Sequence, residues 1–343
     1  MSVSAVAPDE AQVHRARVRT LWVLSLGQVL GGLAVGATVS LGAVLAADIS
    51  GDDALSGLAT AFLTLGTAAV AVPLASYANR RGRRPALTAG MVVALAGVVL
   101  VVGATAIRSF PLLLAAFALI GSGQAANLQS RFAATDLATD SSRARDLSIV
   151  VWATTVGAVL GPNLLGPGEA LGDAVGMPSL TGPYLFTVVA QVLAVVLYLV
   201  GLRPDPLLLA QRVAHAVGGA ARRIAREDRP IAARYAIAVI AAAHGVMVSV
   251  MAMTPIHLVN HGESLQLVGV TISLHIAGMF ALSPVFGILA DRVGRIATIL
   301  VGQALLILAM LTASFGQDST VSVTIGLTLL GLGWSASTVA GSA

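Results

Sequence analysis

Two histidines have the chemistry to exchange protons, because each lies in a long stretch that carries no Asp, Glu, Lys or Arg. His244 falls inside the uncharged run 235–262, and His275 falls inside the run 264–290. Histidine titrates closest to physiological pH, and ionisable groups at membrane depth usually serve function, so the pair predicts a proton relay. The alternative, a histidine that hydrogen-bonds between helices for packing, explains each residue alone at least as well.

Uncharged polar side chains in such stretches are the other candidates for a binding site. A lining with few polar groups suits a hydrophobic or amphipathic solute better than a sugar or a phosphate. These side chains can equally satisfy one another between helices. The residues that we place at a proton or substrate site are Gln28, Gln124, Asn127, His244 and His275.

A charged nonapeptide occurs twice in a chain in which only 10% of the residues are charged. GILADRVGR spans 287–295, and ASYANRRGR spans 75–83 with Asn79 in the place of Asp291. Asp and Arg at a helix end, followed by Gly, predict a tight reversal held by charge-assisted hydrogen bonds. Such a turn can bridge helix ends and open when bundles rock, so we interpret both copies as conformational latches. A positively charged anchor with a turn glycine explains the first copy alone equally well. The latch residues are Asn79, Arg80, Gly82 and Arg83, and Gly287, Asp291, Arg292, Gly294 and Arg295.

Membrane-spanning helices must position these residues. Hydrophobic residues make up 57% of the chain and the mean hydropathy is +0.89, far above the range of soluble proteins. Each long uncharged run can cross about 30 Å of hydrocarbon as a helix, whereas a closed barrel would show short alternating segments. We therefore predict an all-α polytopic membrane protein with ten spans. The runs are 20–47, 54–79, 85–107, 109–130, 147–168, 174–202, 235–262, 264–290, 296–317 and 319–343.

The charges between the runs predict the orientation. If the N-terminus is cytoplasmic, Arg108 is the one basic residue out of 20 in an outer loop, which fits the positive-inside rule. This distribution also argues against a nucleic-acid partner. The first run is too long for a signal peptide, so we expect it to be retained. We expect a multi-pass protein of the cell inner (plasma) membrane, with the lipid bilayer as its surroundings.

The residue types argue against catalysis and cofactors. The chain has no Cys and no Lys, which excludes a thiolate metal site, a Walker lysine and a Schiff-base lysine. It also lacks H-E-x-x-H and G-x-S-x-G, and no acid lies inside any run. We expect no enzyme, no metal and no cofactor.

A polar interval divides the chain into two parts. Residues 1–203 hold six runs, 204–234 form a linker expected on the cytoplasmic side, and 235–343 hold four runs. Within the linker, 207–227 can form an amphipathic helix along the headgroups, and a partly disordered basic segment is nearly as good an interpretation.

Internal similarity supports a duplication of these parts. Gly82 and Gly294 each follow the second run of their part, and LIGSGQAAN in the fourth run resembles LLGLGWSAS in the tenth at nearly the same separation. Equivalent parts would each hold six spans, so two spans are missing after Ala343. A truncated frame and a true ten-span protein both explain this, and we favour truncation.

On these residues the whole chain resembles the major facilitator superfamily (MFS) of secondary transporters. GILADRVGR matches the family's loop signature G-x-L-A-D-R-x-G-R, whereas the first copy has Ala75, Tyr77 and Asn79 in place of Gly, Leu and Asp. The resemblance implies two six-helix bundles, here without the last two helices. It also implies an acid at the cytoplasmic end of span four that receives the Arg after the turn glycine, hence an ion pair between Arg83 and Asp136.

The fifth run contains GAVLGPNLLG, which looks like the G-x-x-x-G-P-x-x-x-G motif of the family's antiporters. Gly157, Gly161, Pro162 and Gly166 match it. Small residues four apart let helices approach closely, and a proline bends a helix, so ordinary packing is the alternative. Phe117 stands where proton-coupled members commonly have an arginine.

We therefore predict a secondary active transporter that works by alternating access. Resemblance to the drug/multidrug antiporter branch implies export of hydrophobic or amphipathic small molecules in exchange for protons, and we expect a monomer. An uptake or uniport carrier of a small metabolite and a truncated, non-transporting fragment are the alternatives.

Overall fold

The structure is a computed structural model that describes residues 10–139, 142–216 and 230–342. In this part of the chain all regular elements are helices, as predicted. The described residues form nine spans long and apolar enough to cross a membrane, or ten if one bent helix pair counts as a span. The helices are α1 (Glu10–Ser50), η1 (Asp53–Leu55), α2 (Gly57–Arg81), α3 (Arg83–Ala106), α4 (Phe110–Ala133), α5 (Arg143–Asn163), α6 (Leu165–Ala174), α7 (Tyr184–Gly201), α8 (Pro206–Ala216), α9 (Pro230–Asn260), α10 (Leu265–Phe280), α11 (Ser283–Val293), α12 (Arg295–Phe315) and α13 (Thr320–Ser342).

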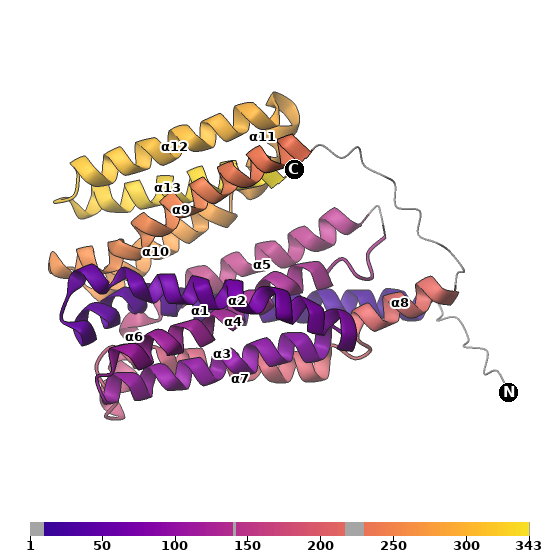
Figure 1. Ribbon diagram of the computed structural model, residues 1–343, viewed down its shortest axis with the longest axis horizontal. Coiled ribbons are helices and arrows are strands. Elements are labelled where there is room, and N and C mark those ends of the chain that lie inside the picture. Colours follow the sequence, from indigo (N-terminus) through magenta and orange to yellow (C-terminus); the bar gives the residue numbers. More distant parts are fainter. Residues whose placement is uncertain (1–9, 140–141, 217–229, 343) are drawn as a thin grey trace.

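Two groups of helices lie side by side (Figure 1). In the first group α1 packs on α5 and α7, and α4 packs on α2 and α3; in the second, α13 packs on α10 and α12. Contacts of α9 with α1 and of α10 with α5 join the groups. The predicted boundaries 1–203, 204–234 and 235–343 stay a prediction, as does the loss of two spans.

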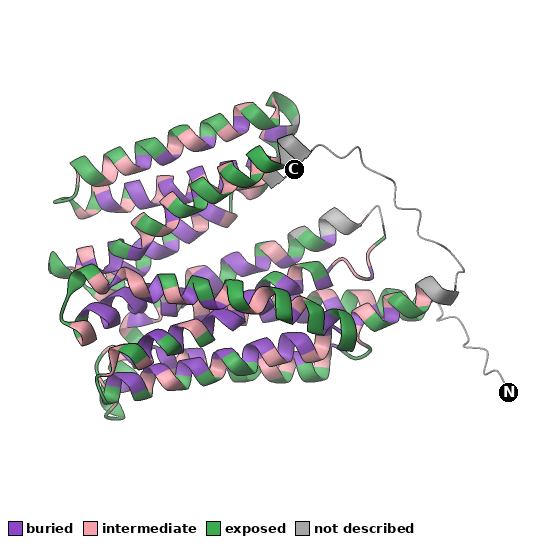
Figure 2. Cartoon of the chain, in the orientation of Figure 1, coloured by how far each residue is buried: buried purple, intermediate pink, exposed green. Residues whose placement is uncertain are grey.

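Apolar side chains cover the outside of the molecule. Exposed and buried residues alternate around helices such as α12 (Figure 2), and Ile296, Leu300 and Phe315 on that helix are more than 60% exposed. Side chains of this size would be unfavourable in contact with water, and they suit a lipid surface.

Two predicted spans differ from the observed helices. The run 174–202 starts with Gly176 in a left-handed conformation (φ +71°), followed by Pro178 and Pro183, so the helix begins only at Tyr184. The run 147–168 is broken: α5 ends at Asn163, and α6 follows at a bend of 50°. Of the predicted linker helix 207–227, α8 accounts for the residues up to Ala216, and the rest lies outside the described residues.

The two nonapeptides form turns of the same shape. Gly82 separates α2 from α3 with φ +101°, and Gly294 separates α11 from α12 with φ +104°. Residues with a side chain rarely adopt such angles, so both positions require glycine. The shared geometry supports the internal similarity found in the sequence.

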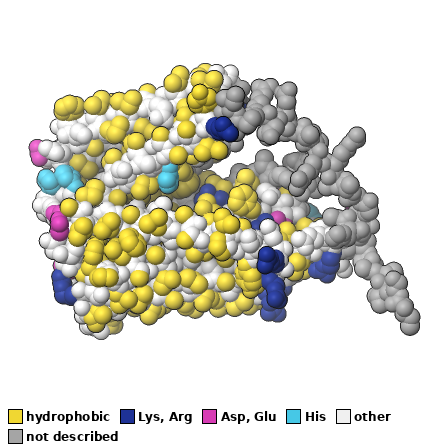
Figure 3. Space-filling view, in the orientation of Figure 1, with side chains coloured by type: hydrophobic (Ala, Val, Ile, Leu, Met, Phe, Trp, Pro, Cys, Tyr) yellow, Lys and Arg dark blue, Asp and Glu magenta, His cyan; other side chains and the backbone are white. Residues whose placement is uncertain are grey.

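The molecule is closed at one end and open at the other. We call the end that carries α8 the α8 end, and the opposite one the η1 end. At the η1 end, Asn260 of α9 donates a hydrogen bond to Asp53 of η1 (2.6 Å), and Ser56 contacts the sulfur of Met253 at 3.4 Å. The surface is hollowed between the two groups (Figure 3).

Candidate functional site

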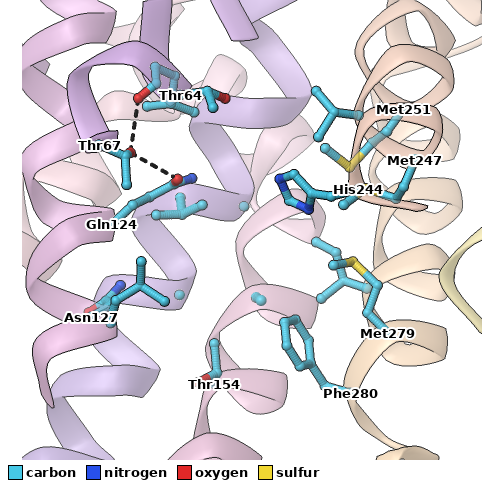
Figure 4. Close-up of a pocket in the computed structure, with 18 of the residues that line it drawn as sticks. Thr64, Thr67, Gln124, Asn127, Thr154, His244, Met247, Met251, Met279 and Phe280 are labelled. Carbon is cyan, nitrogen blue, oxygen red and sulfur yellow. Dashed lines mark hydrogen bonds between the residues drawn. The ribbon is translucent and has the colours of Figure 1, made fainter. Parts of the chain in front are cut away.

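A cavity of ≈ 330 Å³ lies between the two helix groups. One side, which we call the polar wall, comes from α2, α4 and α5, and the other, the apolar wall, comes from α9, α10 and α13 (Figure 4). The polar side chains of this wall are Thr60, Thr64, Thr67, Gln124, Asn127 and Thr154, and they lie among apolar residues of the same helices and of α1. The apolar wall consists of Met247, Met251, Ile276, Met279, Phe280 and Trp334.

The polar wall has hydrogen-bonding capacity that the described residues do not use. The Thr67 hydroxyl lies 2.9 Å from Leu63 O, 3.0 Å from Gly121 O and 3.2 Å from Oε1 of Gln124, and the amide nitrogen of Gln124 has no partner among the described residues. Asn127 is 7% exposed, and its Oδ1 has no partner in the described part of the chain. Buried polar atoms are normally satisfied, so these amides are suited to hydrogen-bond a bound solute.

His244 lies in the cavity lining next to Trp334. The indole Nε1 of Trp334 donates a hydrogen bond to Nδ1 of His244 at 3.1 Å, so the neutral imidazole carries its proton on Nε2. Protonation would place a hydrogen on Nδ1 and end this bond. The protonation state of His244 on α9 is thereby linked to the contact between α9 and α13.

Arg131, in the last turn of α4, also lines the cavity. Its guanidinium carbon lies 6.0 Å from the centre of the Phe280 ring, and within the described residues its buried Nε has no hydrogen-bond partner. The sequence does not point to Arg131 directly, because it lies just outside an uncharged run. Its spacing from Gln124 and Asn127 was the available signal, because residues three, four and seven apart share a helix face.

Two of the five predicted site residues lie away from this cavity. Gln28 is fully buried between helices: its amide donates to Asn127 O (2.8 Å) and Ser130 Oγ (2.6 Å), and its Oε1 accepts from Thr154 (3.1 Å). His275 is also fully buried, with Nδ1 2.7 Å from Leu327 O of α13. The structure thus brings Gln124, Asn127 and His244 together, and the site roles of all five stay predictions.

The expected ion pair of Arg83 and Asp136 is present at the α8 end. Arg83 Nε lies 2.8 Å from Oδ2 of Asp136, and Nη2 lies 3.1 Å from Oδ1. The side chains are only 10% and 9% exposed. Burial raises the pKa of the Asp136 carboxyl above its usual range; the hydrogen bond and charge of Arg83 oppose this rise, and the negative charge of Asp205 adds to it.

Asp205, which the sequence did not single out, ties the first latch to the linker. Its Oδ2 accepts the backbone N–H of Arg84 at 2.7 Å, and its Oδ1 accepts from Leu207 and Leu208 in the first turn of α8. Asn79 and Arg80 are exposed at the end of α2. A carboxylate therefore meets this turn from α8, although Asn79 has replaced the usual acid.

The comparisons with known proteins decide the family. The profile of the Major Facilitator Superfamily matches residues 24–343. The chain belongs to the Major Facilitator Superfamily. It is thus a multi-pass membrane transporter rather than an enzyme.

Its relatives are also transporters. The chain is 36% identical over 334 residues to the uncharacterized MFS-type transporter YddS of Bacillus subtilis (strain 168), over 95% of this chain and 76% of that one. It is 31% identical over 320 residues to the riboflavin transporter RfnT of Brucella anthropi, over 92% and 77%. The inward open xylose transporter XylE from E. coli shares the fold, with a TM-score of 0.68 at 15% identity over 95% of this chain and 86% of that one.

The second latch of this MFS transporter lies at the turn between α11 and α12. Gly287 lies within α11, and Arg292 and Arg295 are exposed on either side of Gly294. The side chain of Asp291 lies outside the described part of the structure. The latch function of both MFS turns stays a prediction.

The antiporter-like motif lies where α5 meets helices of both groups. Gly157 faces the α1 backbone so closely that a Cβ there would overlap Val29. Pro162 is buried near the end of α5, and its carbonyl group faces Gly269 of α10. Gly161 is buried too, whereas Gly166 has open space around it. In this MFS chain the motif thus forms close helix contacts, and its connection with antiport stays a prediction.

Proposed function

We propose that this MFS protein exports amphipathic small molecules in exchange for protons, by alternating access to the cavity between its two helix groups. The pairing of a polar wall with an apolar wall in that cavity is the observation that carries the proposal. Amides and hydroxyls can orient one end of a solute, while methionine side chains adapt to varied apolar shapes. The name of the relative RfnT gives riboflavin, a solute with a flat ring system and a polar chain, as its substrate.

His244 is the proton site in this proposal. His244 and Arg131 are the ionisable residues among those that line the cavity, and an arginine stays charged at any physiological pH. Loss of the Trp334 hydrogen bond on protonation gives the proton a means of changing the contact between α9 and α13. This change is what a coupled carrier needs, because a ligand shifts an equilibrium only through different interactions in the two states.

The α8 end is the cytoplasmic end in this proposal. The arginine-rich loops collect there, in agreement with the positive-inside rule. The closed η1 end then faces outward, and the observed state is open to the cytoplasm. Export is supported by the match of the α5 segment to the motif of the family's antiporters, which includes the drug/multidrug branch.

A uniport carrier is the second candidate. The cavity lining has no Asp or Glu among the described residues, and Phe117 occupies the position of the family's usual proton-linked arginine. A carrier of this kind would move its solute down a gradient without protons.

Everted membrane vesicles from a host without its own efflux pumps test the proposal. We expect amphipathic compounds to dissipate an imposed pH gradient in vesicles that contain the protein, and not in empty vesicles. In the variant His244→Gln this dissipation should be lost, whereas solute exchange without a gradient should continue. Solute movement that is independent of the pH gradient in the unmodified protein would favour uniport.

A further inference from the structure

We infer that Arg131 makes the cavity a site for amphipathic organic anions, with a carboxylate or sulfonate against the guanidinium and an apolar body against the apolar wall. The inference rests on the proposed function, since it names the substrate class of the same cavity. The observation behind it is that the positive charge of Arg131 has no acidic partner among the described residues.

Arg131 is a cation in an apolar protein without an acidic partner in the part of the chain that the structure describes. Two other arginines at the α8 end do have acidic partners: Arg83 pairs with Asp136, and Arg17 pairs with Asp146, which it contacts at 2.6 and 2.8 Å. The contact of Arg131 with the Phe280 ring, at 6.0 Å, is a weak cation–π interaction. Arg131 is half-buried, and its Nε is buried without a partner among the described residues; a charge held in this way is costly, and a bound anion would offset part of that cost.

Gln124, on the same face of α4 as Arg131, can add a hydrogen-bond donor. Its amide nitrogen lines the cavity without a partner among the described residues, whereas the unpartnered atom of Asn127 is its Oδ1, which would accept from a hydroxyl or N–H group of the solute. An amide nitrogen and a planar guanidinium are the donors that fit the two oxygens of a carboxylate. No Asp or Glu of the described residues lines this cavity, so its charge is positive and it disfavours cations.

Phe280 connects the charged end of the site to the apolar wall. It contacts Arg131 on one side, and its ring lies edge-on to Trp334, with ring centres 5.8 Å apart, on the other. Met279 precedes it in the sequence, and Met247 and Met251 lie one turn apart on α9. An aromatic body placed along these side chains would hold its acidic group near Arg131, and this geometry defines the solute class.

Matched acid and amide compounds test the inference by binding alone. The purified full-length chain in detergent is titrated with naphthalene-1-carboxylate and naphthalene-1-sulfonate, and with the corresponding neutral carboxamide and sulfonamide. Thermal unfolding and tryptophan fluorescence are followed. We expect each acid to bind roughly 10- to 100-fold more tightly than its amide, which is the range for a hydrogen bond to a charged group.

Variants of arginine residues then show whether Arg131 causes the tighter binding of acids. Arg131→Gln should remove it while amide binding remains, which also shows that the variant is folded. Arg131→Lys should retain part of it, because the charge remains and the two-pronged geometry is lost. Arg212→Gln, at an exposed position on α8 outside the latches and the cavity lining, is the matched control and should leave the preference for acids unchanged.

Three outcomes would overturn the inference: amides that bind as tightly as their acids, no binding of either acid, or an acid preference that survives in Arg131→Gln. The binding test needs no pH gradient, so it separates the two proposals. Anion-selective binding without proton-coupled transport would support the anion site and contradict the antiport mechanism. Proton-coupled transport without anion-selective binding would support antiport and contradict the anion site.

Discussion

Trp334 of α13 donates a hydrogen bond to Nδ1 of His244 on α9, and the two rings lie with their centres 6.1 Å apart in the wall of the cavity between the helix groups. The bond exists only while His244 is neutral. The bond faces the cavity and joins two helices of the second group, so its loss would change how α9 packs on α13. Protonation of His244 is therefore coupled to the loss of this contact between α9 and α13.

Replacing Trp334 by Phe tests this relationship. The variant keeps an aromatic ring against Phe280 and removes the donor that favours neutral His244. One hydrogen bond is worth about 1 kcal/mol net, so we expect the pH profile of transport to move upward by up to about one unit. The profile of Trp22→Phe, at an exposed position on α1, should not move. An unchanged profile in Trp334→Phe would show that His244 does not carry the proton.

Exchanging the charges of Arg83 and Asp136 tests the first latch. Each single reversal places two like charges in a site that is about nine-tenths buried, and breaking such a pair costs roughly 3–5 kcal/mol. We expect Arg83→Asp and Asp136→Arg to lose folded protein or transport, and the double variant to recover part of both. Size-exclusion chromatography and vesicle transport are the measurements. A double variant no better than the singles contradicts the latch.

The raised pKa of Asp136 predicts a pH dependence of stability. Burial disfavours the charged carboxylate in the folded state, so the contribution of this group is fully present below the unfolded pKa and is lost as the pH rises through the folded pKa. Asp136→Asn mimics the protonated form and lacks this dependence. The measured quantity is the difference in Tm between wild type and variant, which should change in favour of the variant as the pH rises from about 4 to 7. A constant difference would contradict the raised pKa.

Gly157 and Gly166 offer a matched pair within one motif. A methyl group at Gly157 would meet the Val29 backbone of α1, whereas nothing lies within 4 Å of one added at Gly166. We expect Gly157→Ala to destabilise the protein by roughly 1–3 kcal/mol, the range for an overpacked core, and Gly166→Ala to have little effect. Thermal unfolding in detergent checks both. Equal Tm values for the two variants would show that α1 and α5 are not tightly packed at Gly157.

The fold followed from the sequence because its determinants are local. The length of an uncharged run predicts a span, and a glycine in a charged turn predicts a chain reversal. The helices and the turns at Gly82 and Gly294 can therefore be predicted from the sequence. The predicted partner of Arg83 was found because the family's pattern places it. The late start of α7 was missed because a hydropathy run does not register Gly176, Pro178 and Pro183 as a helix break.

The cavity lining can be predicted only in part from the sequence, because it depends on which faces of distant helices meet. Gln28 and Gln124 have the same side chain, yet one is used up between α1, α4 and α5 while the other faces the cavity. His244 and His275 differ in the same way. Arg131 follows an uncharged run, and only its place in the cavity lining and its contact with Phe280 show that it faces the cavity.

The isolated charge of Arg131 also makes the empty carrier responsive to membrane potential. When the cavity changes the side to which it is open, that charge crosses part of the electric field, and a full crossing is worth about 2.3 kcal/mol per 100 mV. With a negative cell interior, and with the α8 end on the cytoplasmic side as proposed, the field favours an empty cavity that faces the α8 end. A bound monoanion cancels the charge, so the loaded carrier turns outward without opposition from the field. The membrane potential would then drive the empty carrier back to the state that faces the α8 end. A bound anion would remove this effect of the potential, so that it does not oppose the outward step.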